Sequence, residues 1–572
     1  MARTAAIGIQ DFSVLIEKNC FYVDKTCFIK DWWENEDTVT LITRPRRFGK
    51  TLMMSMLYHF FSVSQTGRGE LFTRLDIWKE EKYQKLQGTY PVIFLSFANV
   101  KCDNFKETYD VICRLIAREY RKYVYILEDD RFLEADRRQY DRIMEGDADP
   151  ADLRASLNLL SEYLYRYYEK KVIILLDEYD TPMQEAYVNG YWKELTEFIR
   201  GLMNATFKTN FYLERAVMTG ITRVSRESVF SDLNNPAVVT TTTRLYETAF
   251  GFTEDEVCHA LEEYGLQDEK EGVKQWYDGF RFGDCDHIYN PWSVIHFLRF
   301  REYAAYWANT SSNKLIGNLI QKGSQKVKIV MEDFMKGRPF RTVLDEQIVF
   351  EQLGQSEHAI WSLLLAGGYL KVVDCRWNKR HKKEYTLDIV NLEVRQMFED
   401  MFLNWFSVCG ADYNDFIKAL LNNDVKRMNT YMNKVALQVT GSFDSGSMPS
   451  EKTEPERFYH GLVLGLMIDL SDRYVLTSNR ESGFGRYDVL LEPGSYEDDG
   501  IILEFKVYDH QEESGLSATA DSALRQVIDK KYETALKCSR EKIRIYGFAF
   551  KGKKVLIDGG YIREVEARLM SR

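Results

Sequence analysis

The chain has 572 residues, 45% of them hydrophobic, and a formal net charge of −11 at pH 7. This length allows about three globular domains, and the acidic balance means that a nucleic-acid partner would need a local basic patch rather than bulk charge. No apolar run approaches the roughly 20 residues of a membrane span, and nothing resembles a signal peptide, so we expect a cytoplasmic protein without a membrane partner. The nine scattered cysteines form no Cys-x-x-Cys pair, so we expect neither a disulfide framework nor a zinc ribbon.

The first functional pattern is the stretch 39–57, which runs from a short apolar strand through the loop RPRRFG into an apolar helix that begins with Lys50 and Thr51. This is the layout of a nucleotide phosphate loop. The helix-start amides and the helix dipole attract phosphate, the lysine reaches the β- and γ-phosphates, and the threonine hydroxyl binds Mg²⁺. The pattern therefore predicts ATP and Mg²⁺ as cofactors, held by Arg46, Arg47, Phe48, Gly49, Lys50, Thr51 and Leu52. The alternative is a basic turn that binds no nucleotide.

One position departs from this motif, because Arg44 stands where G-x-x-x-x-G-K-[ST] has its first glycine. A side chain at this position can narrow the loop or change its turn. We therefore expect ATP binding, whereas hydrolysis stays open. The guanidinium of Arg44, like those of Arg46 and Arg47, can also add phosphate contacts.

The second pattern is the apolar run 172–176, which ends in Asp177 and Glu178. An all-apolar strand suits the centre of a parallel sheet, and ligands bind at the carboxyl ends of such strands. Asp177 is predicted to hold Mg²⁺, directly or through water, and Glu178 to polarise the water that attacks the γ-phosphate. Asp180 is either a further ligand or a helix N-cap. Alone, the run is as typical of a strand end with solvated acids; the phosphate loop upstream favours the ATPase interpretation.

The strand 215–220 ends in a polar segment. A polar residue at a strand end beside the nucleotide is the sensor position of such ATPases, so either Thr219 or Thr222 is predicted to contact the γ-phosphate. Either Arg223 or Arg226 is a candidate arginine finger, acting within the chain or across a subunit boundary. The second arrangement would require a homo-oligomer.

Several segments together resemble a known family. They are LITRPRRFGKTL, VIILLDEYDTPM, VMTGITRVSRES, FSDLNN, GFTEDEV, WYDGFRFG and IYNPWSV. These segments are similar to those of bacterial AAA-ATPase-like proteins that carry a C-terminal PD-(D/E)XK nuclease-like domain, and the likeness covers roughly residues 5–300 and resumes near 455. In that family an arginine at the first glycine position looks usual. The resemblance implies an ATPase related to the AAA+ and STAND-type classes.

The expected fold class is α/β: a P-loop ATPase parallel sheet with a helical lid, a winged-helix-like middle region, and a C-terminal α/β PD-(D/E)XK nuclease-like domain. We place the ATPase domain at 1–250, the lid at 251–340, the winged-helix-like region and helical connector at 341–440, and the nuclease-like domain at 455–572. The aromatic turns at 276–280 and 289–292 are expected to serve structural packing.

The middle region contains a predicted helix at 360–365 and two predicted strands at 369–373 and 385–390. The connector between the strands is basic, with the residues Arg376, Lys379, Arg380, His381, Lys382 and Lys383. It is either a hairpin tip that contacts a nucleic-acid backbone or a solvated turn. Residues 441–455 are the best candidate for a linker.

The C-terminal region carries a second set of reactive side chains. Glu504 and Lys506 alternate with Phe505 along an apolar strand, so they share one face, and charged groups there are costly without a purpose. Asp488, on the neighbouring strand, completes the PD-(D/E)XK constellation. Asp488 and Glu504 are predicted to bind Mg²⁺, Glu456 to complete the metal shell, and Lys506 to orient water and stabilise the transition state.

Gln526 and Tyr532 match accessory positions of the family, where they are expected to contact phosphate or the catalytic lysine. The alternative is a PD-(D/E)XK-like fold without activity. The whole sequence thus predicts an ATP-binding and ATP-hydrolysing protein that controls a Mg²⁺-dependent nuclease acting on DNA, and the resemblance implies defence against phage or mobile elements, or DNA processing. The rival hypotheses are a nucleotide-operated switch that does not cleave, and a nuclease whose ATPase half is a structural relic.

Overall fold

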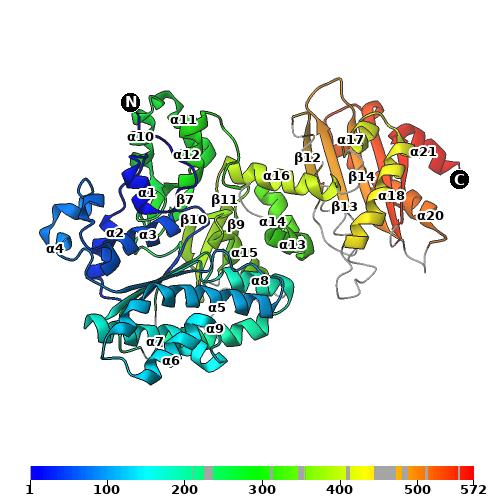
Figure 1. Ribbon diagram of the computed structural model, residues 1–572. Coiled ribbons are helices and arrows are strands. Elements are labelled where there is room, and N and C mark those ends of the chain that lie inside the picture. The colour runs from blue at the N-terminus through cyan, green and yellow to red at the C-terminus, as the bar shows by residue number, and fades with distance from the viewer. Residues whose placement is uncertain are drawn as a thin grey trace. The chain divides into compact units, whose positions relative to one another are not determined.

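The computed structural model describes residues 2–208, 210–223, 236–308, 314–344, 353, 356–407, 413–442, 465, 470, 472–479, 487–508, 513–551 and 554–571. The chain forms two compact units, Met1–Leu319 with Gly337–Arg395 and Ile320–Lys336 with Gln396–Arg572 (Figure 1). The four-part division expected from the sequence is finer than these units and remains a prediction. Across the described ranges, no helix combines the length and hydropathy that crossing a bilayer requires.

The first unit is built on a five-stranded sheet in which all neighbouring strands are parallel. Its strands are β1 (Val39–Thr43), β2 (Val92–Ser96), β3 (Val172–Asp177), β4 (Leu213–Gly220) and β5 (Ala237–Val239), in the order β2-β3-β4-β1-β5. Every residue of β1 and β3 is buried, as expected for central strands covered on both faces. The predicted parallel α/β fold is confirmed.

The main helices of this sheet are α3 (Lys50–Phe61), α5 (Phe105–Lys122), α6 (Glu134–Glu145), α7 (Pro150–Tyr168), α8 (Thr181–Asn189) and α9 (Trp192–Phe207). In the sheet, β4 lies between β1 and β3. The carboxyl ends of these three parallel strands therefore meet at one edge, where ligands of such sheets bind. This strand order brings the phosphate loop, the Asp177–Glu178 pair and Thr219 together.

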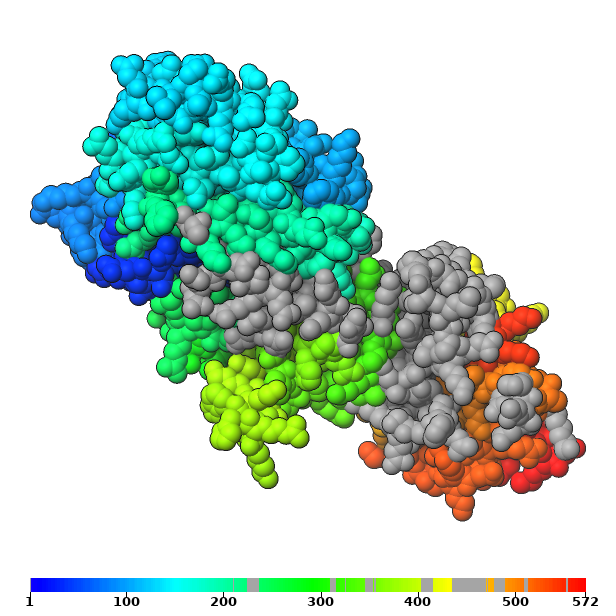
Figure 2. Space-filling view, turned by 90° about the horizontal axis from the view of Figure 1, so that it is seen from below, coloured from blue at the N-terminus to red at the C-terminus, as the bar shows by residue number. Residues whose placement is uncertain are grey.

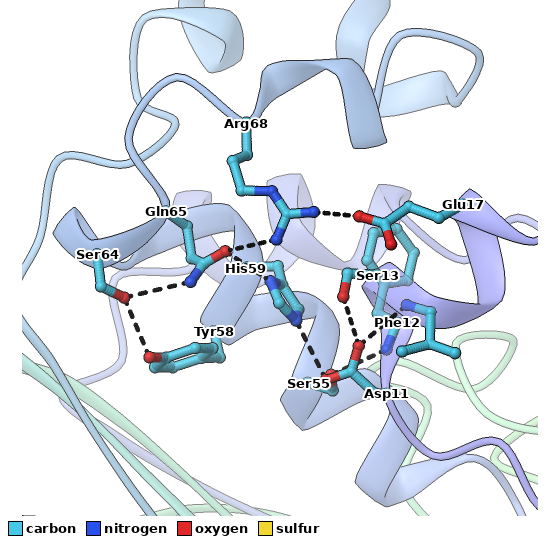
Figure 3. Close-up of polar contacts among 11 residues, drawn as sticks. Asp11, Phe12, Ser13, Glu17, Ser55, Tyr58, His59, Ser64, Gln65 and Arg68 are labelled. Carbon is cyan, nitrogen blue, oxygen red and sulfur yellow. Dashed lines mark hydrogen bonds and ion pairs between the residues drawn. The ribbon is translucent and has the colours of Figure 1, made fainter. Parts of the chain in front are cut away.

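A lead-in segment packs against the helix that leaves the phosphate loop. It contains α1 (Phe12–Glu17) and α2 (Cys27–Glu34). Figure 3 shows the Phe12 amide donating to Ser55 Oγ (2.9 Å) and His59 Nε2 lying 3.3 Å from Asp11 Oδ2. The second ring nitrogen of His59 contacts Gln65 Oε1 (3.0 Å). These bonds anchor the middle and the end of α3.

A small α/β layer follows in the chain. It contains the strands β6 (Phe252–Thr253), β7 (Phe280–Phe282) and β8 (Cys285–Tyr289), in the antiparallel order β6-β8-β7, and the helices α10 (Glu254–Glu263), α11 (Lys270–Tyr277) and α12 (Pro291–Phe300). Thr253 and Glu256 form a capping box on α10, and Asn290 caps α12 before a proline. The region predicted as a helical lid therefore also contains strands, since Phe280 pairs with Ile288.

The predicted winged-helix-like region contains a helix and a three-stranded antiparallel sheet in the order β10-β11-β9. These are α15 (Glu357–Ala366), β9 (Phe340–Val343), β10 (Leu370–Trp377) and β11 (Lys383–Ile389). The helices α13 (Lys314–Lys322) and α14 (Gln325–Met335) precede this sheet in the chain, and α16 (Leu392–Ser407) follows it. The predicted helix and β-hairpin are both present.

The second unit is built on a mixed five-stranded sheet in the order β12-β13-β14-β15-β16. Its strands are β12 (Tyr474–Asn479), β13 (Tyr487–Pro493), β14 (Gly500–Val507), β15 (Ile543–Lys551) and β16 (Lys554–Tyr561), and β14 pairs with β15 in parallel while the other neighbours are antiparallel. The helices α17 (Tyr413–Leu421) and α18 (Val425–Ser442) share a hydrophobic core with one face, and α20 (Leu516–Asp529) and α21 (Ile562–Met570) with the other. The predicted C-terminal α/β fold is confirmed, and α17 and α18, expected as a connector, are part of its core.

Two asparagines of α18 complete the edge of this sheet. Asn429 donates to the Ile557 carbonyl (2.6 Å) and accepts from its amide (2.8 Å), and Asn433 does the same with Val555 (2.6 and 3.0 Å). The side chains thus replace a neighbouring strand for β16, whose backbone groups would otherwise be open for pairing with another chain.

Candidate nucleotide site and candidate nuclease site

The phosphate loop lies between β1 and α3. Gly49 is the N-cap residue of α3, and its φ of +82° is a left-handed conformation in which a side chain would be strained. Lys50 is 4% exposed, and its ammonium donates to the carbonyls of Arg44 (3.0 Å) and Pro45 (2.8 Å). Burial lowers the pKa of Lys50, and the carboxylates at and after the end of β3 oppose this shift. The loop therefore surrounds the ammonium and holds it near these acids.

The carboxylate of Asp177, at the end of β3, is the centre of a hydroxyl network. Its Oδ2 accepts from Thr51 Oγ1 (2.8 Å), and its Oδ1 accepts from Thr219 Oγ1 (2.5 Å). Burial raises the pKa of Asp177, and the two hydroxyl bonds partly offset this. Carboxylate and hydroxyl oxygens are the hard ligands that Mg²⁺ prefers, so this donor set fits the predicted metal. Leu52, next in the first turn of α3, is half-buried.

The two other acidic residues after β3 are placed differently. Glu178 is partly exposed and has a strained left-handed backbone (φ +50°). Asp180 is buried, and its Oδ2 accepts from the amide (2.8 Å) and hydroxyl (2.6 Å) of Thr222 and from Gln184 Nε2 (3.0 Å). Although Asp180 is the N-cap residue of α8, its side chain makes no capping bond. It ties the end of β4 to α8 instead.

The two candidate sensor threonines bond to different carboxylates. Thr219 bonds to Asp177 directly, and its hydroxyl also accepts from the Glu178 amide (3.3 Å). Thr222 bonds to Asp180 instead, which is not part of the Asp177 donor set. Arg223 is partly exposed beside Thr222, and Arg226 lies outside the described residues. Thr219 is therefore the better placed of the two threonines.

Arg44, at the motif's first glycine position, is fully buried with 0% of its surface exposed. Its guanidinium donates to the carbonyls of Thr43 (3.0 Å) and Thr240 (2.7 Å) and lies 4.4 Å from the ring centroid of Phe282. Burial lowers its pKa to about 9. The guanidinium is already occupied by these carbonyls and the aromatic ring, so it is placed for a structural role rather than for the phosphate contact suggested by the sequence. It ties the loop to the segment after β5.

The rest of the phosphate loop is held by the small α/β layer. Trp307 Nε1 donates to the Arg46 carbonyl (3.0 Å), and the Arg47 guanidinium lies 4.2 Å from the ring centroid of Trp292. Phe48 is 1% exposed and contacts both phenylalanines of β7, with centroids 4.7 and 5.3 Å away. The aromatic turns do serve packing, as expected, but what they pack on is the phosphate loop itself. Their spacing in the sequence carries no sign of this.

A buried carboxylate that no sequence pattern indicated supports these contacts. Glu393 is 0% exposed and accepts from Ser293 Oγ (2.9 Å) and from the backbone amide of Trp307 (2.5 Å). Burial raises the pKa of Glu393 to about 7, against the effect of these donors. Glu393 thereby positions the tryptophan that bonds to the loop carbonyl of Arg46.

In the second unit, Glu504 and Lys506 lie on the face of β14 that α20 covers. Lys506 Nζ donates to Ser522 Oγ of α20 (2.7 Å), whereas Phe505 lies in the core formed with α17 and α18. The strand register places Asp488 directly opposite Glu504. Glu456 and the side chain of Asp488 are outside the described part of the chain.

The Glu504 carboxylate is 0% exposed, and neither oxygen has a hydrogen-bond partner among the described groups. An ionised carboxylate in that condition is costly unless a cation offsets its charge, so this side chain fits a metal ligand. The described side chains contain no cluster of three or more His, Cys, Asp or Glu suited to a metal. On α20, Gln526 Nε2 donates to Tyr532 OH (3.4 Å), so these accessory residues contact each other.

Comparisons with known proteins match one domain model to each of the two regions that carry these candidate sites. Residues 6–230 match the family model of the AAA-ATPase-like domain, described as a predicted AAA-ATPase, and residues 454–559 match that of the PD-(D/E)XK nuclease superfamily. The chain is also similar to the "Uncharacterized protein in vnfD 5'region" of Azotobacter chroococcum mcd 1, with 24% identity over 562 residues, 95% of this chain and 96% of that protein. The chain thus contains an AAA-ATPase-like domain in its N-terminal part and a domain of the PD-(D/E)XK nuclease superfamily in its C-terminal part.

Proposed function

We propose that the N-terminal unit binds and hydrolyses ATP with Mg²⁺, and that this ATPase controls a Mg²⁺-dependent nuclease in the C-terminal unit that acts on DNA. The observation that carries the nuclease half is the fully buried Glu504 carboxylate, which has no partner among the described groups and lies on the same strand face as Lys506. The ATPase half is supported by the Asp177 carboxylate, held by two hydroxyls near a buried lysine.

In the ATPase, Lys50 binds the β- and γ-phosphates, and the amides at the start of α3 contribute the positive end of the helix dipole. Thr51 and Asp177 hold Mg²⁺, which supplies charge neutralisation at the phosphates when bound. Glu178 is partly exposed, so it can orient the attacking water and accept its proton. Arg223 contributes positive charge within the chain or across a homo-oligomer boundary.

In the nuclease, the metal-holding residues are Asp488, Glu504 and Glu456. Lys506 orients the attacking water and offsets negative charge that develops on the scissile phosphate. Its bond to Ser522 fixes the ammonium on the α20 face of the sheet. A bound Mg²⁺ supplies acidification of water and a counter-charge for the phosphate.

The test compares cleavage of single- and double-stranded DNA and RNA by the wild type, Lys50→Ala and Lys506→Ala, with and without ATP and Mg²⁺. Lys506→Ala is expected to lose about a hundredfold or more of the cleavage rate, and Lys50→Ala to lose ATP binding and any ATP effect on cleavage. The matched controls are Lys537→Ala and Lys79→Ala, which remove exposed lysines from the same two units.

Three results would change the assignment. ATP binding without cleavage of any nucleic acid would indicate a nucleotide-operated switch. Cleavage that is unaffected by ATP and by Lys50→Ala would make the ATPase half a structural relic. Preferred cleavage of RNA would correct the substrate.

A further inference from the structure

The tip of the β10–β11 hairpin is a concentrated basic surface on an acidic protein. Four of its five residues at 379–383 are lysine or arginine, with His381 between them, whereas the chain as a whole has a formal charge of −11. All five are exposed. The hairpin belongs to the segment coloured yellow-green in Figure 2, which projects from the surface.

The cations of this tip are not neutralised by acidic side chains of the described residues. Within the described part of the chain, Lys379, Arg380, Lys382 and Lys383 make no ion pair, whereas Arg376, just before the tip, pairs with Asp374 (2.6 Å). Like charges held this close repel each other. A counter-charge from outside would relieve this repulsion.

A single asparagine holds the turn in shape. Asn378 Oδ1 accepts from the amides of Arg380 (2.9 Å) and Lys382 (3.0 Å), and its Nδ2 donates to Glu384 Oε1 (3.2 Å). The Asn378 amide also donates to the Lys382 carbonyl (2.9 Å), and His381 has a left-handed backbone (φ +54°). The basic side chains therefore extend from a defined turn, so less conformational entropy is lost when they bind.

An aromatic platform lies next to the cations. Trp377, the last residue of β10, is 68% exposed and stands directly opposite Lys383, whose ammonium is 5.8 Å from the indole ring centroid. Exposed indole with neighbouring lysine and arginine is the combination with which proteins stack a nucleic-acid base and neutralise its phosphates.

We propose that the β10–β11 tip is a nucleic-acid contact surface in the first unit, in which the four cations bind backbone phosphates and Trp377 stacks on an unpaired base. This surface consists of other residues than the candidate nuclease site, and its binding does not depend on cleavage. An anionic membrane is the less suitable partner, because the residues that follow Trp377 at the tip are all polar and provide no apolar face to insert.

The test measures binding of the full chain to fluorescent single- and double-stranded DNA and RNA in EDTA, where metal-dependent cleavage cannot occur. The variant combines Lys379→Gln, Arg380→Gln, Lys382→Gln and Lys383→Gln. We expect about tenfold or weaker binding, with the slope of log K against log salt reduced by roughly 3 for single strands. The charge-matched control combines Arg74→Gln, Lys79→Gln, Lys82→Gln and Lys85→Gln, all exposed on another surface of the first unit, and should bind nearly as the wild type does.

Trp377→Ala is the second variant. Loss of one stacked base should weaken single-strand binding by roughly fivefold or more while leaving double-strand binding almost unchanged, and Trp377→Phe should recover most of the loss. Equal binding by the tip variant and the charge-matched control would overturn the proposal. Tip-dependent binding to phosphatidylserine vesicles, with no tip-dependent binding to nucleic acid, would overturn it as well. An inactive nuclease would affect neither measurement, because both are made without cleavage.

Discussion

The buried arginine of the phosphate loop leads to a test that separates two roles for the same residue. Arg44→Ala removes a guanidinium that bonds to the Thr43 and Thr240 carbonyls and stacks on Phe282. If this side chain ties the loop to the segment after β5, the substitution should destabilise the first unit even without nucleotide. If it were a phosphate ligand, the loss would appear in ATP affinity instead.

The expected magnitude follows from the contacts. A buried carbonyl left without its donor costs about 1–3 kcal/mol, and three carbonyls lose a donor here, those of Thr43, Thr240 and, through a longer bond of 3.4 Å, Tyr246. A desolvated cation–π contact adds about 1–2 kcal/mol. The variant has no buried guanidinium, so the desolvation free energy of that charge is absent and offsets part of the destabilisation. We expect a net destabilisation of about 3 kcal/mol, which corresponds to a fall of roughly 6 °C or more in the unfolding temperature of a large domain.

The assay is calorimetric and denaturant unfolding of the full chain without ATP, combined with titration of ATP and Mg²⁺. Arg47→Ala is the matched control, because it removes the same charge from the same loop at an exposed position that contacts Trp292. It should cost less than about 1 kcal/mol. If Arg44→Ala unfolds as the wild type does but binds ATP about tenfold more weakly, the reasoning from burial is wrong and the guanidinium contacts phosphate.

Three more predictions concern other polar side chains of the two units. The pKa of Glu393 is raised from 4.5 to about 7 in the folded state, so the folded state binds more protons than the unfolded state between these pH values. The contribution of Glu393 to the free energy of unfolding should therefore fall by on the order of 3 kcal/mol as the pH rises through that window. Glu393→Gln should flatten the pH dependence of the unfolding temperature of the first unit, and an unchanged pH slope would refute this. Asn429→Ala together with Asn433→Ala should destabilise the second unit by several kcal/mol, about 1–3 kcal/mol for each unpaired backbone group, and should promote aggregation through β16. Urea unfolding measures the first effect and light scattering the second. The control Thr430→Ala, on the exposed side of the same helix, should show neither. Thr219→Val keeps the side-chain shape but removes the hydroxyl on the β3 carboxylate, so Mg²⁺-dependent ATP binding measured by calorimetry should weaken about tenfold; equal affinity would exclude this threonine from the site.

Much of both candidate sites could be recognised along the chain because their parts are local in sequence. The phosphate loop needs only a strand, a glycine at positive φ and the first turn of a helix, and all of these fall within residues 39–57. The common face of Glu504 and Lys506 follows from the two-residue period of a strand. The all-apolar composition of β3 predicted its place among parallel strands, and the β3 burial pattern agrees.

Other features were decided only by the tertiary structure, because they depend on contacts between residues far apart in the chain. Nothing near Arg44 in the sequence says that its charge is taken up by the Thr240 carbonyl, or that Trp307 and Glu393 hold the loop from the other side. The asparagines of α18 likewise acquire a purpose only where β16 becomes a sheet edge. A sequence pattern specifies which polar groups a local helix, strand or turn carries. Long-range packing determines which distant residue forms the hydrogen bond with each buried polar group, because such a group can bond to any suitable partner that the fold brings within reach.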